Sequence, residues 1–185
     1  MLCEICSSPC FPGARGRKPR FCSGRCRVAA HRSKTYPAEL TQLPRWIRHK
    51  AKRPMHPNGY WISVTDSQAL SSYQTAKAAK SGDGLGFVLN GDGIICIDLD
   101  HCFDRQPSAE AQALIDTLPD TYIEVSPSGT GIHIWAKAQM TAGRKFTRNG
   151  LSIEIYPNGR FITMTGNALK RAELATIDIN AIVQS

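Results

Sequence analysis

Residues 84–104, GLGFVLNGDGIICIDLDHCFD, contain the pattern that decides the fold. Two apolar runs flank the sequence NGDG at 90–93, which is typical of the turn in a β-hairpin. In the second run, residues 94–100, Ile95, Ile97 and Leu99 point one way and Asp98 and Asp100 the other, because successive side chains of a strand point to opposite faces of a sheet. We therefore expect Asp98 and Asp100 to share one face of a strand whose other face is buried.

The pair Asp98 and Asp100 is a candidate metal site. Like charges beside a buried sheet repel each other unless a cation lies between them. Carboxylate oxygens favour Mg2+ or Mn2+, the ions that polarise and orient phosphates. Two solvated acids at the end of a strand are the alternative interpretation, because Asp-x-Asp is a common sequence.

A second candidate site lies in residues 122–135, YIEVSPSGTGIHIW, which predict a strand, a tight loop and a strand. Gly129 and Gly131 would let backbone N–H groups approach phosphate oxygens, and Ser128 would add a hydroxyl donor. His133 lies on the strand face opposite the aliphatic residues. It could hydrogen-bond a phosphate, although a lone histidine is more often structural.

A third polar cluster follows in residues 151–167, LSIEIYPNGRFITMTGN. Aliphatic and polar residues alternate over 151–156, so Glu154 lies on the polar face of a predicted strand. A Pro-Asn-Gly turn then leads into a further strand that begins with Arg160. One sheet would thus present three carboxylates, a histidine and a guanidinium. The phosphate-type loop beside them favours a nucleotide site over a chance arrangement on an exposed sheet.

The charge of the chain is concentrated at one end. A length of 185 residues is expected to give one main domain with a small appendage, not a large multidomain protein. The composition, 42% hydrophobic and 21% charged, is ordinary for a globular protein and excludes wholesale disorder. Residues 1–60 contain 13 Lys and Arg against 2 Asp and Glu, whereas the rest contains 10 against 13. The basic end favours a polyanionic partner, most plausibly nucleic acid, over a merely solvated basic surface.

Five of the seven cysteines lie in the first 26 residues, which indicates a metal site. The predicted ligands of a tetrahedral Zn2+ ion are Cys3, Cys6, Cys22 and Cys26. A disulfide framework is the alternative, but it needs an oxidising compartment and the chain begins without a secretory signal. Cys10 and His31 stay outside the predicted ligand set.

Three helices complete the expected structure. Residues 23–33, SGRCRVAAHRS, predict a short basic helix that Ser23 caps. Residues 67–80, capped by Asp66, and residues 108–118 predict two helices that cover the apolar side of the sheet. The expected organisation is a zinc-finger module (1–35), a linker (36–44) and a catalytic domain (45–185).

The three polar clusters, in this order and at roughly this spacing, resemble the catalytic motifs of archaeo-eukaryotic primases. The likeness is strongest to the bifunctional primase-polymerase domain of phage and plasmid replication proteins, and it covers about residues 42–168. The cysteine-rich start resembles small zinc fingers of the CxxC...FCSxxCR type, for which a nucleic-acid contact is common.

The resemblance implies an α+β fold: a mostly antiparallel sheet with flanking helices, an RRM-like catalytic core, preceded by the zinc finger. It also implies template-directed nucleotidyl transfer from nucleoside triphosphates. The implied catalytic ligands of two Mg2+ or Mn2+ ions are Asp98, Asp100 and Glu154. The implied nucleotide-binding residues are Ser128, Gly129, Gly131, His133 and Arg160.

The expected partners are single-stranded template DNA, nucleoside triphosphates and a separate replicative helicase. The zinc finger would assist template binding or primer initiation. No stretch approaches the roughly 18 apolar residues of a membrane span, so we expect no membrane contact and a cytoplasmic location. Two other function classes stay open: a non-catalytic zinc-finger DNA-binding replication or regulatory factor, and a metal-dependent nuclease.

Overall fold

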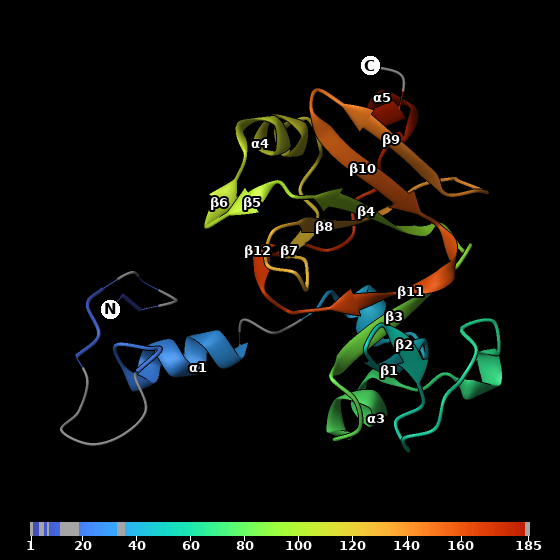
Figure 1. Cartoon of the computed structure of the whole chain (residues 1–185), viewed down its shortest axis with the longest axis horizontal. Coiled ribbons are helices and arrows are strands. Elements are labelled where there is room, and N and C mark those ends of the chain that lie inside the picture. Colours follow the sequence, from blue (N-terminus) through green and yellow to red (C-terminus); the bar gives the residue numbers. More distant parts are fainter. Residues whose placement is uncertain (1, 4–5, 7, 12–18, 33–35, 184–185) are drawn as a thin grey trace. The chain divides into compact units, whose positions relative to one another are not determined.

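The computed structural model describes residues 2–3, 6, 8–11, 19–32 and 36–183 of the chain (Figure 1). The chain divides into two compact units, residues 1–35 and residues 36–185. In the described residues, every helix falls short of the length and apolar character that crossing a bilayer requires.

The first unit pairs a cysteine-bearing turn with a short helix. A backbone hydrogen bond of 2.8 Å from Cys3 N to Ser8 O closes the turn. Helix α1 (Gly24–Arg32) begins after Ser23, whose Oγ accepts a 3.2 Å hydrogen bond from the backbone N–H of Cys26. The prediction of a short helix capped by this serine is confirmed.

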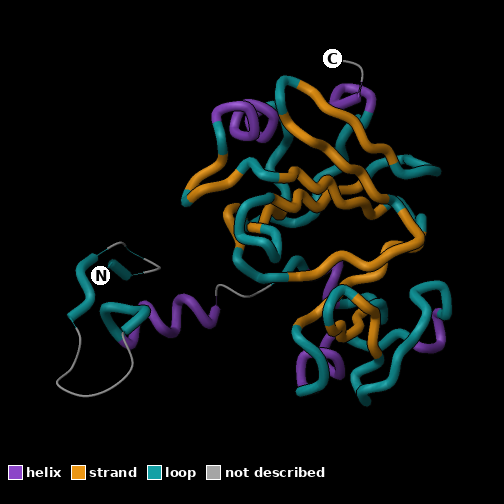
Figure 2. Tube along the Cα trace, in the orientation of Figure 1, coloured by secondary structure: helices purple, strands orange, loops and turns teal. Residues whose placement is uncertain are grey.

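Antiparallel β-sheet, drawn in orange in Figure 2, is the main regular structure of the second unit. The strands of one sheet are β1 (Trp46–Lys50), β2 (Arg53–Met55), β3 (Gly84–Asn90) and β11 (Asn158–Met164). The strands of the other are β4 (Ile94–Asp100), β7 (Tyr122–Val125), β8 (Ile132–Lys137), β9 (Arg144–Arg148), β10 (Leu151–Tyr156) and β12 (Ala168–Lys170). Their orders are β11–β3–β1–β2 and β12–β7–β8–β4–β10–β9. A short hairpin of β5 (Phe103–Asp104) and β6 (Gln106–Pro107) follows β4. The predicted α+β class with mostly antiparallel sheet is confirmed.

Two hydrophobic cores lie on opposite faces of the six-stranded sheet. On one face, α4 (Ala109–Asp116) and α5 (Asn180–Val183) pack against aliphatic side chains of β4, β8 and β10 (Figure 1). On the other face, an aromatic core joins this sheet to the four-stranded sheet. The ring centroids of Trp46 and Phe87 are 5.3 Å apart, and those of Phe87 and Trp135 are 5.7 Å apart. The aromatic core therefore holds the two sheets face to face.

The segment between β3 and β4 is not the predicted hairpin turn. Gly91 and Gly93 adopt positive φ angles of 87° and 96°, and the chain passes here from the four-stranded sheet to the six-stranded sheet. The buried Arg45 holds this crossing, because its Nη2 lies 2.9 Å from Asp92 Oδ2 and its Nη1 bonds the side chain of Asn90. β3 pairs with β1 and β11 instead of β4.

Residues 67–80 form two short helices rather than the single helix that we expected. They are a 3-10 helix, η1 (Ser67–Ala69), and α3 (Tyr73–Ala78). Between them, Ser71 and Trp46 exchange two backbone hydrogen bonds of 2.9 Å, which take the chain out of helical geometry. α3 consequently packs beside β1 in the aromatic core, and not on the aliphatic face of the six-stranded sheet.

Residues 36–44 pack within the second unit, although we expected them to be a linker. Tyr36 and Leu40 are buried in the aromatic core, and Leu40 belongs to α2 (Ala38–Thr41), which precedes the first strand. The indole N–H of Trp46 donates a 2.8 Å hydrogen bond to Leu40 O, and the hydroxyl of Tyr36 donates one of 3.2 Å to Met164 O. Apolar side chains among the prolines and polar residues give this segment its place in the core.

Candidate active site

A row of polar side chains crosses the six-stranded sheet in direct register. From β7 to β9 the row contains Glu124, His133, Asp98, Glu154 and Lys145, and each residue is the cross-strand partner of the next. Directly opposed residues of antiparallel strands share a face, so these five side chains lie on one face of the sheet. It is the face that carries the aromatic core, which buries Cys96 and Trp135 two positions along from Asp98 and His133.

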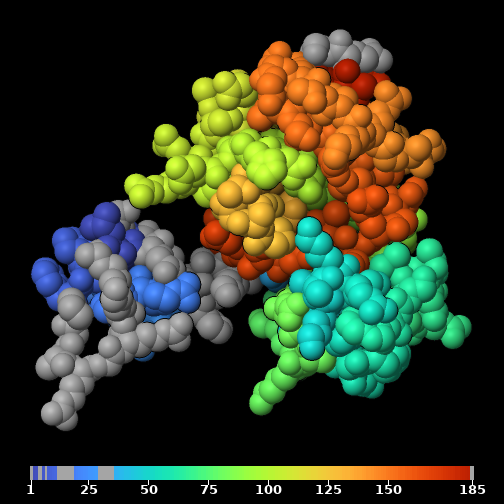
Figure 3. All heavy atoms as spheres, viewed as in Figure 1, coloured from blue at the N-terminus to red at the C-terminus, as the bar shows by residue number. Residues whose placement is uncertain are grey.

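A cavity of about 470 Å³ lies between the two sheets at this row. Asp98 and His133 line it from the six-stranded sheet, whereas Lys52 and Arg160 line it from the four-stranded side. Pro127 of the β7–β8 loop completes one edge. In Figure 3 the cyan β1–β2 segment lies against the orange-red β11 and the yellow-orange β7–β8 loop. The cavity thus combines one carboxylate with three groups that can bind phosphate oxygens.

Asp98 lies at the centre of the row, where burial and neighbouring charged groups shift its pKa. Burial raises the pKa of Asp98, and the neighbouring carboxylates Asp100 and Glu154 raise it further, while His133 and Lys52 act in the opposite direction. Neighbouring carboxylates repel one another, and their oxygen atoms are the ligands that a hard divalent cation prefers. The oxygen ligands of the three acids match Mg2+ or Mn2+ in chemical type.

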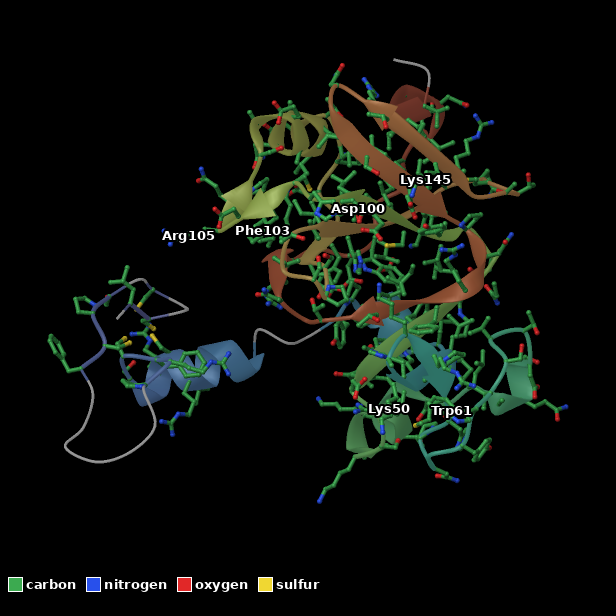
Figure 4. The ribbon with its side chains drawn as sticks, viewed as in Figure 1. Lys50, Trp61, Asp100, Phe103, Arg105 and Lys145 are labelled. Carbon is green, nitrogen blue, oxygen red and sulfur yellow. The ribbon has the colours of Figure 1, made fainter. Side chains whose placement is uncertain are left out.

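Lys145 supplies positive charge to this acidic group in the structure. Its ammonium donates a hydrogen bond to Glu154 Oε1, and this bond raises the pKa of Lys145. Figure 4 shows Asp100 and Lys145 on the same sheet. Among the described residues, the three acids do not gather three ligand atoms within 4.8 Å of one another, as the cysteines of the first unit do. Asp98 and Glu154 are thus cross-strand partners, Asp100 lies opposite Ser152 on the same face, and Lys145 holds Glu154.

The β7–β8 loop has the tight geometry that its glycines suggest. Gly129 has a φ angle of +78°, and a Cβ atom at Gly131 would lie 2.6 Å from the carbonyl oxygen of Leu99. The hydroxyls of Ser126 and Ser128 lie 3.0 Å apart. Ser128 is exposed and lies beside Pro127, but its side chain is not part of the cavity lining. The loop therefore lies at the cavity edge.

Arg160 reaches the cavity from β11, so our expectation that it shares a sheet with the acids is wrong. The chain leaves β10 at Pro157 and enters the four-stranded sheet through a bulge at Gly159, whose φ angle is +72°. The guanidinium carbon of Arg160 lies 3.7 Å from the centroid of the Tyr156 ring. This arrangement places Arg160 and His133 on different walls of one cavity.

Three polar residues of this region were not predicted from the sequence. Lys52 lies in the two-residue turn between β1 and β2, where Ala51 and Lys52 both adopt positive φ angles. Several other basic residues lie near it in the sequence, so the sequence did not distinguish Lys52 as the one that faces the cavity. Glu124 precedes the glycine-rich loop, and extending the hairpin register backwards from that loop would have paired it with His133. Lys145 lies on β9, a strand that the sequence pattern did not reveal.

The four predicted cysteine ligands come together in the first unit. The Sγ atoms of Cys3, Cys6, Cys22 and Cys26 all lie within 4.8 Å of one another. Individual Sγ distances are 3.4 Å for Cys6–Cys22 and 3.6 Å for both Cys22–Cys26 and Cys6–Cys26. Tetrahedral zinc with bonds of about 2.3 Å separates its sulfur ligands by roughly 3.8 Å, so the cluster fits zinc. Cys10 is buried nearby but is not a member of the cluster, and the side chain of His31 lies outside the described residues.

Comparison with known proteins gives two matches. Residues 9–180 match the family described as bifunctional DNA primase/polymerase, N-terminal. The chain is also similar to a protein described as DNA primase-polymerase from Nitratiruptor phage NrS-1, with 30% identity over 158 residues. That alignment covers 77% of this chain and 22% of the phage protein, so the chain spans less than a quarter of the length of this relative.

Proposed function

This chain belongs to the bifunctional DNA primase/polymerase family, and from that premise we propose that it adds nucleotides, taken from nucleoside triphosphates, to a strand paired with single-stranded template DNA. One observation carries the proposal: the cavity between the two sheets combines Asp98 and His133 on one wall with Lys52 and Arg160 on the other. A separate helicase is the expected source of single-stranded template.

The basic residues of the cavity would bind the triphosphate of the incoming nucleotide. Arg160 offers a planar fork of N–H donors and Lys52 an ammonium group, both suited to phosphate oxygens. His133 would contact the nucleotide from the opposite wall. The N–H groups of Gly129 and Thr130 donate within the β7–β8 loop, to Ser126 O and Ser128 Oγ, so contact with a phosphate would replace these bonds. Ser128 would act from the rim of this loop.

The carboxylates would hold divalent cations. Asp98, Asp100 and Glu154 are the proposed ligands of Mg2+ or Mn2+, which when bound would polarise the reacting phosphate and favour loss of pyrophosphate. In the structure Lys145 neutralises Glu154, so ligation by Glu154 requires this ammonium to move away. Lys145 is exposed and can do so without disturbing the core.

The cysteine cluster would bind structural zinc and hold α1 against the preceding turn. Arg25 and Arg27 of this helix are exposed and can contact template phosphates. We expect the finger to assist template binding or primer initiation.

The products formed from defined templates test this function. The full chain is incubated with primed or unprimed single-stranded DNA, labelled nucleotides and Mg2+ or Mn2+. Longer primers would support polymerase activity, and new short oligomers from unprimed template would support primase activity. Shortened templates would instead indicate a nuclease. Unchanged templates that nevertheless bind the protein would indicate a non-catalytic DNA-binding factor.

A further inference from the structure

Glu124 is a fully buried carboxylate at the end of the polar row. Its exposed fraction is 0%, and neighbouring donors fix both of its oxygens. Oε2 accepts hydrogen bonds of 2.8 Å from the backbone N–H of Gly166 and 3.0 Å from the hydroxyl of Tyr122. Oε1 accepts one of 3.2 Å from the backbone N–H of Thr165. Because two backbone N–H groups hold this buried carboxylate, its orientation does not depend on side chains that can change rotamer.

The free side of Glu124 faces the imidazole of His133. Oε1 lies 3.6 Å from His133 Nδ1, while His133 Nε2 lies 3.7 Å from Asp98 Oδ1. His133 is only 3% exposed, and its Nδ1 is buried with no hydrogen-bond partner among the described residues. A small shift of the ring would bring Nδ1 into hydrogen-bond range of Glu124. The carboxylate next to this nitrogen is therefore fixed in place.

We propose that Glu124 is a positioning residue, which holds the His133 imidazole with Nδ1–H directed into the protein and Nε2 directed at the nucleotide cavity. A carboxylate that accepts from Nδ1–H fixes both the ring plane and the tautomer. Nε2 of this neutral ring is then an acceptor, which suits a hydroxyl of the nucleotide rather than a phosphate oxygen. This inference rests on the proposed function, because it gives His133 a role in binding the nucleotide.

The competing interpretation is that Glu124 serves only the fold, by accepting the N–H groups of Thr165 and Gly166. The two interpretations differ in whether Glu124 and His133 act through each other. Residues that act as a unit are non-additive, whereas independent effects multiply.

The test is a double-mutant cycle on nucleotide incorporation with Glu124→Gln, His133→Ala and the double variant. Glu124→Gln should lower kcat/KM roughly ten- to a hundredfold, the range found when a partner that orients a functional histidine is lost. In the His133→Ala background the same change should cost no more than about twofold. Glu124→Asp, which keeps the carboxylate, should recover part of the loss. Losses that multiply in the double variant would overturn the inference.

Tyr122→Phe is the matched control. It removes one hydrogen bond to Oε2 and leaves Oε1 facing His133, so incorporation should stay near the wild-type rate. A loss equal to that of Glu124→Gln would indicate that general weakening of this region is sufficient, and would contradict a specific role through His133.

A measurement on the wild-type chain keeps the inference separate from the proposed function. Nitrogen NMR of the histidine rings at alkaline pH, with His133 assigned from the His133→Ala spectrum, reports which ring nitrogen carries the proton. We expect Nδ1–H. A proton on Nε2 alone would overturn the positioning role, even if the chain incorporates nucleotides. A wild-type chain that incorporates none would overturn the proposed function, while the ring spectrum would still decide the role of Glu124.

Discussion

Lys52 reaches the cavity from the β1–β2 turn, and its surroundings differ from those of Lys50, two residues earlier. Lys52 lines the cavity, whereas Lys50 ends β1 outside the lining and is exposed (Figure 4). If Lys52 contacts the triphosphate, Lys52→Ala should raise the KM for nucleotide by roughly ten- to a hundredfold, because a hydrogen bond to a charged group contributes about 1.5–3 kcal/mol. The kcat should change much less.

Incorporation rates over a range of nucleotide concentrations measure this effect. Lys50→Ala is the control, since it removes the same charge from the same hairpin. Equal KM values for the two variants would show that Lys52 acts only through the general charge of the surface.

His49 predicts a pH dependence of stability. Burial lowers the pKa of His49, and Arg48 lowers it further, while Asp83 acts in the opposite direction. Its ring stacks on Phe161, with centroids 5.6 Å apart, and its Nε2 lies 3.4 Å from Thr163 Oγ1. The unfolded chain takes up this proton near the ordinary histidine pKa of about 6.5, and the folded chain does so only at lower pH. Between these two pKa values the unfolded state binds more protons.

The free energy of unfolding should therefore fall as the pH drops below about 6.5, and the His49 contribution should level off once the folded chain is protonated too. Urea unfolding of wild type and His49→Phe at several pH values measures the effect. His49→Phe should flatten the slope in this window. Identical slopes for wild type and His49→Phe would contradict the assignment.

The cysteine-bearing turn and α1 form the element for which ligand removal is most informative. Cys22 belongs to the four-sulfur cluster, and Cys10 is a buried cysteine outside it. Purified wild type should contain one zinc ion per chain, and Cys22→Ser should lose most of it, because a structural zinc site needs four ligands. Cys10→Ser should retain the metal.

Metal analysis by mass spectrometry, after dialysis without strong chelator, measures the zinc content of the three proteins. Zinc loss from Cys10→Ser, with full retention by Cys22→Ser, would show that the ligand set is different from the four cysteines that converge in the structure.

Elements with a clear local pattern were predictable from the sequence, and their assembly was not. Alternation over 151–156 and the loop between β7 and β8 identified the correct strands, because one buried face imposes a period of two. The NGDG turn was misread because the same residues suit a tight hairpin and a crossing between sheets. That choice depends on Arg45, which lies 45 residues before Asn90, immediately precedes β1 and binds the turn through its side chain.

At the scale of the whole catalytic unit, the site depends on two sheets held face to face. The sequence located the acids, the glycine-rich loop, His133 and Arg160, because each follows a local pattern. It did not show that Arg160 lies on the opposite wall, or that Lys52 joins it there, since sheet membership is set by contacts distant in sequence. Lys145 was not predicted for the same reason, because the pairing of β9 with β10 is what places it beside Glu154.

The central claim is that the acids beside this cavity perform nucleotide addition, and primer extension by Asp98→Ala tests it most directly. Burial and the neighbouring acids raise the pKa of Asp98, so removing its carboxylate relieves unfavourable charge and should leave the fold intact. Asp104→Ala, at an exposed acid on β5, is the matched control. With saturating nucleotide and Mg2+ or Mn2+, we expect extension at the wild-type rate from Asp104→Ala and only background from Asp98→Ala. A folded Asp98→Ala protein that extends primers as fast as wild type would contradict the account.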